Sequence, residues 1–121
     1  MPRSYHKIRP RHKRANAALH VWLVELRKKF PTREPVVLRF DSLREKSCIG
    51  YCESDAGGHV ITIDDGLRGP LTFFLDTLIH EYAHALQWEG PERNRVDHDA
   101  AWGIIYARLV QWAYDHRLWP E

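Results

Sequence analysis

Two histidines and a glutamate stand in the spacing H-E-x-x-H at residues 80–84, as His80, Glu81 and His84. On a helix, residues four apart lie on one face, about 6 Å apart along the axis. The two imidazoles can therefore hold one tetrahedral metal ion without bending the backbone. Glu81 lies about 100° further round the helix, close enough to take a proton from a water at that ion. The spacing predicts a zinc site with its own general base, provided that the segment is helical and a third ligand exists.

The third ligand must come from outside the motif, because catalytic zinc needs three protein ligands and an open fourth position. The metzincin pattern requires glycine at 87 and histidine at 90, but this chain has Gln87 and Gly90. No acid on the following helix stands where a thermolysin-like ligand would be expected. His98 lies beyond a polar segment that is long enough to turn back, at the start of a further helix. There Asp97 or Asp99 can cap that helix, so His98 is the predicted third ligand.

The first half of the chain predicts one helix and three strands. Apolar residues recur at helical spacing from Ala15 to Phe30, and Pro31 ends this run. Strand-like patterns follow at about residues 36–40, 48–53 and 59–64. The glycine-rich segment 54–58 is typical of a hairpin connection between the second and third strands.

The second half predicts two helices joined by a polar loop. The H-E-x-x-H segment falls inside the periodic run 71–86, which begins after Pro70 and closes at Gly90. Tyr82 points about 200° away from His80 and is assigned to the core. Residues 89–97 are polar and aperiodic, as in a loop. A last helix from about residue 99 is expected to bury Trp102, Ile105, Tyr106, Leu109, Trp112 and Ala113.

This order of elements predicts an α+β fold, with a small three-stranded antiparallel or mixed sheet packed on zincin-type helices. A chain of 121 residues forms one domain, assigned to residues 15–121, and residues 1–14 are assigned to a flexible basic arm. The strand at residues 60–64 is expected to be an edge that can pair with an extended peptide.

The charge of the chain is distributed unevenly. The formal net charge is +2, but residues 1–14 hold six Lys and Arg and no acid, whereas the remainder holds 12 basic and 16 acidic residues. A basic arm on a mildly acidic body predicts contact with a polyanion, above all nucleic acid. A solvated tail that keeps the protein soluble explains the arm equally well.

Composition indicates a cytoplasmic protein, with association to DNA or the nucleoid left open. No apolar run approaches the ~20 residues that a membrane span requires, and the N-terminus lacks the pattern of a signal peptide. Cys48 and Cys52 are too few for a secreted disulfide scaffold and are interpreted as reduced thiols.

The two histidine elements resemble those of the SprT-like zinc metallopeptidases. Residues 76–86, D-T-L-I-H-E-Y-A-H-A-L, resemble that family's acidic-Thr-Leu-Leu-His-Glu-x-x-His-Ala-Leu helix. Residues 98–102, H-D-A-A-W, are similar to its downstream His-Gly-x-x-Phe/Trp element, and G-Y-C at 50–52 and I-T-I at 61–63 resemble its strands. The likeness covers about residues 15–115. It departs from the family where Asp99 replaces glycine and where no cysteine-rich zinc ribbon follows.

This resemblance implies a zinc endopeptidase with ligands His80, His84 and His98 and with Glu81 as the base. The family is associated with proteolysis of DNA-bound and DNA-crosslinked proteins. The implied partners are therefore protein or peptide substrates, with DNA contacted through the basic arm. Two other functions stay open: a nucleic-acid-binding module whose zinc is structural, and a regulatory peptidase that cleaves a repressor.

Several further side chains have two interpretations each. Asp76 either orients a ligand or is an acid favoured in the first turns of its helix. Tyr106 either donates to an oxyanion or packs in the core. Trp88 and Trp119 are candidates for exposed contacts, and the other tryptophans are assigned to the core. Of the remaining histidines, His6 and His12 are assigned to the arm, and His20, His59 and His116 are given no role.

Overall fold

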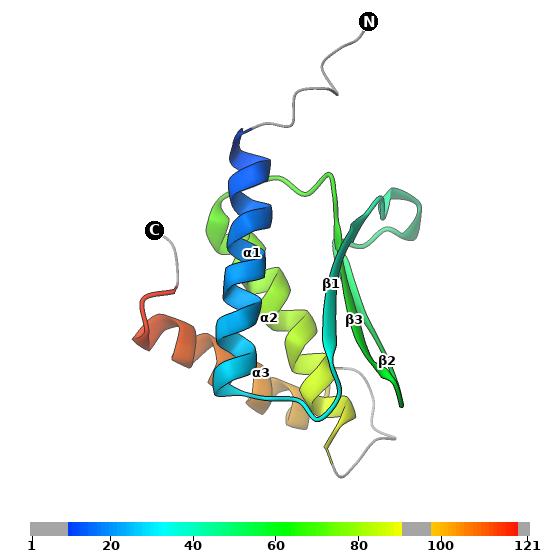
Figure 1. Cartoon of the computed structure of the whole chain (residues 1–121), viewed down its shortest axis with the longest axis vertical. Helices are drawn as coiled ribbons and strands as arrows, with labels where there is room; N and C mark the ends of the chain where they lie inside the picture. Colours follow the sequence, from blue (N-terminus) through cyan, green and yellow to red (C-terminus); the bar gives the residue numbers. More distant parts are fainter. Residues whose placement is uncertain (1–9, 91–97, 119–121) are drawn as a thin grey trace, which may run out of the picture.

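The computed structural model describes residues 10–90 and 98–118 and confirms the α+β class, with helices packed on a mixed sheet. The α-helices gather on one side of the sheet (Figure 1). In chain order the elements are α1 (Pro10–Lys29), β1 (Val36–Asp41), the short 3-10 helix η2 (Arg44–Lys46), β2 (Gly50–Asp55), β3 (Gly58–Asp64), α2 (Leu71–Trp88) and α3 (Ala100–Asp115).

The sheet has the order β1-β3-β2, with β1 parallel and β2 antiparallel to the central β3. The prediction that residues 60–64 form an open edge is therefore wrong, because both sides of β3 are paired. Strand β2 is an edge instead, and it begins at Gly50, two residues later than expected. Gly58 has a φ of +148° and its backbone approaches Pro35 so closely that a Cβ would lie 2.9 Å from the carbonyl oxygen. Only glycine suits this link between the hairpin and the start of β1.

Helix α1 begins at Pro10, five residues before the start predicted from apolar spacing. Residues 10–14, assigned to the flexible arm, are thus helical, while residues 1–9 of the arm lie outside the described part. The predicted apolar face is confirmed, since Ala15, Leu19, Trp22 and Leu26 are buried. The helix ends before Pro31, as expected.

Helix α2 lies at the centre of the molecule and contacts α1, α3, β2 and β3 (Figure 1). Tyr82 is fully buried, and its hydroxyl donates to the carbonyl oxygen of Phe30 at 2.5 Å. This confirms the prediction that Tyr82 belongs to the core. Because α2 is packed on several sides, the side chains that it turns toward β2 and α3 are held in fixed positions.

Candidate metal centre

Helices α2 and α3 bring the three predicted histidines together. His80 and His84 lie one turn apart on α2, and His98 directly precedes α3. The Nε2 atom of His98 lies 2.9 Å from Nε2 of His80 and 3.1 Å from Nε2 of His84. The three imidazole nitrogens lie close enough together to bind one metal ion, as expected from the sequence.

The spacing of these nitrogens fits a tetrahedral ion. Bonds of about 2.0–2.1 Å at tetrahedral angles place ligand nitrogens about 3.3 Å apart. The two separations from His98 are close to this value, and the three ligand atoms all lie within 4.8 Å of one another. Burial lowers the pKa of His80 and His98 lowers it further, while Asp76 opposes the shift. The lowered pKa favours the neutral imidazole, which is the form that binds a metal.

His98 reaches the site through an unusual backbone conformation. Its φ is +58°, in the left-handed region, which costs of the order of 1 kcal/mol for a residue with a side chain. The next residue, Asp99, is the N-cap of α3, and its Oδ1 accepts from the backbone N–H of Trp102 at 2.9 Å. The same Oδ1 accepts from Nε2 of Gln87 on α2 at 3.0 Å. Asp99 thus fulfils the predicted capping role and also links the two helices; Asp97 lies outside the described residues.

Trp102 packs directly against the histidine cluster. Its ring centroid lies 4.8 Å from that of His80, 5.4 Å from that of His84 and 4.7 Å from that of His98. On its other side it stacks on Tyr106, at 5.0 Å and an interplanar angle of 9°. The assignment of Trp102 to the core is therefore incomplete, because the half-buried ring also supports the site. The sequence carried one signal for this contact: Trp102 follows His98 by four residues, a spacing that brings side chains together at the start of a helix.

Asp76 and Tyr106, for which the sequence left two interpretations each, are partners. The Tyr106 hydroxyl donates to Asp76 Oδ1, which joins α3 to α2 one turn before His80. Burial and the Asp76 carboxylate raise the pKa of Tyr106 to about 12. This bond favours a structural role for Tyr106 over donation to an oxyanion.

Glu81 lies beside the three histidines. Its side chain is 7% exposed, and Oε2 is 4.0 Å from Nε2 of His80. Glu81 also influences Cys52 on the edge strand β2: burial and, to a smaller extent, the Glu81 carboxylate raise the pKa of Cys52 to about 11. Glu81 therefore occupies the position expected of a base next to the metal site.

A cleft of about 320 Å³ runs between β2 and α2 and contains the histidine cluster. It is lined by Gly50, Tyr51, Cys52, Ser54, His80, Glu81, His84, Gln87, Trp88 and His98. Trp88 lines the cleft and packs edge-on against His59, so an exposed contact through its ring stays a prediction. Trp119 lies outside the described residues. Cys48 and Cys52 are free thiols, as predicted.

His59, which was given no role from the sequence, is fully buried on β3, opposite Ser54 of the cleft wall. Its Nδ1 lies 2.7 Å from Ser54 Oγ, and its Nε2 lies 2.5 Å from Glu89 Oε2. Glu89 also accepts from the backbone N–H groups of Arg33 at 2.7 Å and of Glu34 at 3.1 Å. Burial raises the pKa of Glu89, but the hydrogen bonds from His59 and the two N–H groups lower it below its ordinary value overall. The contacts of Glu89 with His59, Arg33 and Glu34 join residues far apart in the sequence, so no local pattern pointed to them.

Comparisons of the chain with protein-family models, curated proteins and solved structures found no match. In the part of the chain that the structure describes, no helix is long and apolar enough to cross a membrane. The support for a metal site is therefore the position and chemistry of His80, His84 and His98.

Proposed function

We propose that this protein is a zinc-dependent endopeptidase that acts on DNA-associated proteins. The observation that carries the proposal is the convergence of three Nε2 atoms beside the buried Glu81 in an open cleft. Three histidines with an accessible remaining side are typical of catalytic rather than structural zinc, which is closed by four protein ligands. The resemblance of residues 76–86 and 98–102 to the SprT-like peptidases supports the same activity.

The residues of the site have separate roles in this mechanism. His80, His84 and His98 would hold the zinc ion, which supplies an activated water and polarises the scissile carbonyl. Glu81 would accept the proton of the attacking water and later deliver it to the leaving amine. Its place next to His80, on a side chain that is itself only 7% exposed, suits both transfers.

The edge of β2 offers a place for the peptide substrate. Because Asp64 N–H donates to the carbonyl of Ile49, the alternation of an antiparallel ladder directs the backbone groups of Gly50, Cys52 and Ser54 away from β3. An extended peptide can pair with these groups as an added strand along the cleft. The proposed docking strand is thus β2, in place of the strand at 60–64 expected from the sequence.

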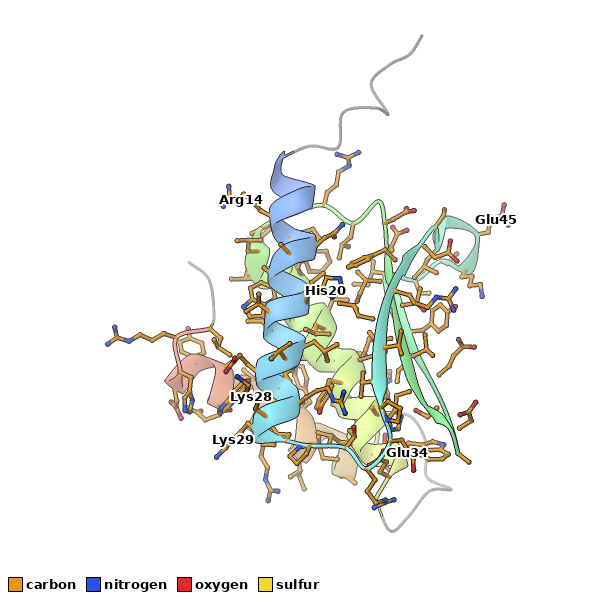
Figure 2. The ribbon with its side chains drawn as sticks, in the orientation of Figure 1. Arg14, His20, Lys28, Lys29, Glu34 and Glu45 are labelled. Atoms are coloured by element: carbon orange, nitrogen blue, oxygen red, sulfur yellow. The ribbon has the colours of Figure 1, made fainter. Side chains whose placement is uncertain are left out.

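The link to DNA rests on charge and on the family resemblance. Arg14, Lys28 and Lys29 are exposed on α1 (Figure 2), and α1 has a single acidic residue, Glu25. Together with the basic residues of the N-terminal arm, they provide cations for phosphate groups. Binding through such contacts weakens steeply with salt, which a titration of labelled DNA at several salt concentrations tests directly.

The test of the peptidase activity compares the wild type with Glu81→Gln, each loaded with one equivalent of zinc. We expect the wild type to cleave a DNA-binding protein substrate, with single- or double-stranded DNA present, and E81Q to retain zinc but lose cleavage. A zinc-loaded wild type that cleaves no protein under any of these conditions contradicts the proposal. Zinc binding without cleavage, together with tight DNA binding, would instead favour a nucleic-acid-binding module with structural zinc.

A further inference from the structure

Ser54, His59 and Glu89 form a continuous row of hydrogen bonds. The lowered pKa of Glu89 keeps its carboxylate ionised, so it can only accept. Nε2 of His59 must therefore carry the proton that it shares with Glu89. In the neutral tautomer that carries its proton on Nε2, Nδ1 of His59 accepts from the hydroxyl of Ser54, 2.7 Å away. This is the arrangement of a hydroxyl nucleophile, its base and the carboxylate that orients the base.

The row resembles a catalytic site, because Ser54 lines the cleft while His59 and Glu89 are buried. Ser54 is half-buried and lines the cleft wall on β2. The side chains of His59 and Glu89 behind it are 0% and 7% exposed. Ser54 and His59 oppose each other across the β2–β3 hairpin, and Glu89 is fixed by the backbone N–H groups of Arg33 and Glu34. Three elements thus hold the row without any contribution from the metal centre.

We propose that Ser54 is a metal-independent nucleophile that accepts acyl groups from ester substrates, with His59 as its base and Glu89 as a positioning residue. Attack forms a bond from Ser54 Oγ to the carbonyl carbon, and the hydroxyl proton passes to Nδ1 of His59. The ester C–O bond then breaks, and the leaving alcohol takes that proton. Water hydrolyses the acyl-serine with the same base, which releases the acid and restores Ser54.

The backbone of the same residue supplies a donor for the developing oxyanion. The register of β2 directs the N–H of Ser54 to the open edge of the sheet, beside the cleft that its side chain lines. A nucleophile's own N–H is a common part of an oxyanion hole. The side of Ser54 toward the metal centre is occupied by Cys52, whose Sγ is 3.7 Å from Ser54 Oγ.

The test uses a fluorophosphonate on the full-length chain in the presence of a zinc chelator. This reagent bonds a nucleophilic hydroxyl oxygen to phosphorus and expels fluoride, which leaves with the serine proton. We expect one adduct by intact-mass measurement, mapped to Ser54 by peptide fragmentation. Ser54→Ala should take up none, whereas Ser42→Ala, which removes an exposed loop serine, should react like the wild type.

A variant of the base distinguishes activation from mere exposure. His59→Gln should react at least about 100-fold more slowly, the usual contribution of a general base. Should H59Q fail to fold, Glu89→Gln takes its place and should also slow the reaction. A folded wild type without an adduct at Ser54, or a folded variant that reacts at the wild-type rate, overturns the proposal. Because the metal is chelated throughout, the result is independent of the proposed peptidase activity.

Discussion

Gln87 on α2 and Asp99 at the start of α3 are joined by a hydrogen bond of 3.0 Å. The carboxylate of Asp99 also caps α3, so one side chain fixes the helix that follows His98 against the helix that carries His80 and His84. The left-handed backbone of His98 lies immediately before this link. Asp99 therefore helps to position the imidazole of His98.

Asp99→Ala should weaken metal binding without unfolding the protein. Loss of the cap costs about 1 kcal/mol, and loss of the link to Gln87 frees His98 to move. We expect zinc affinity to fall about 10- to 100-fold, as for other residues that orient metal ligands. Competition with a chromophoric chelator measures this. Asp99→Asn, whose amide oxygen can still accept, is the matched control and should stay near the wild type; equal affinities for D99A and wild type would contradict the prediction.

His98→Ala should remove a ligand rather than an orienting contact. We expect zinc affinity to fall by more than about 100-fold, because two histidines on one helix leave the ion mostly to solvent. Bound zinc is measured after dialysis against a weak chelator. His20→Ala is the control, since His20 is exposed on α1 (Figure 2) and its ring packs against Phe40, and H20A should retain one zinc. Equal zinc content in H98A and H20A would exclude His98 as a ligand.

The sequence predicted the parts of the site that depend on local spacing. His80, Glu81 and His84 share one helix, and the spacing of four residues alone brings the two imidazoles together. The cap of the last helix was narrowed to Asp97 or Asp99, because the signal for a helix N-terminus is local. The polar segment before His98 is long enough to turn back, which indicated that His98 could reach the other two histidines.

Contacts between separate helices and strands could not be predicted from local spacing. The apolar pattern of residues 59–64 fits an edge or a central strand, and only the pairing of β1 with β3 decides between them. The bonds from Gln87 to Asp99 and from His59 to Glu89 depend on how α2 lies against its neighbours. Such placement is set by packing of the whole core, which no short window of sequence contains.

Trp102→Ala should loosen the histidine cluster that its ring supports. The ring contacts all three imidazoles, so its loss leaves a gap behind them and lets their side chains rotate. We expect zinc affinity to fall about 10-fold, with Trp102→Phe close to the wild type because it keeps an aromatic face. The electronic absorption spectrum of the cobalt-substituted protein reports the ligand geometry and should change in W102A alone. Identical spectra and affinities for W102A and W102F would contradict a supporting role.

Glu89 should make the fold sensitive to acid. Its pKa is lower in the folded protein than its ordinary value of 4.5, so its contribution to stability is complete above that value and is lost as pH falls through the folded pKa. Glu89→Ala leaves His59 and the N–H groups of Arg33 and Glu34 without their acceptor and should lower the free energy of unfolding by about 3 kcal/mol at pH 7.

Urea unfolding between pH 7 and pH 3 measures both effects, with Glu45→Ala at an exposed site as the control (Figure 2). The difference in free energy of unfolding between wild type and E89A should become smaller below about pH 4.5. The difference between wild type and E45A should stay small at every pH. A difference between wild type and E89A that does not change with pH would show that the carboxylate does not stabilise the fold through its charge.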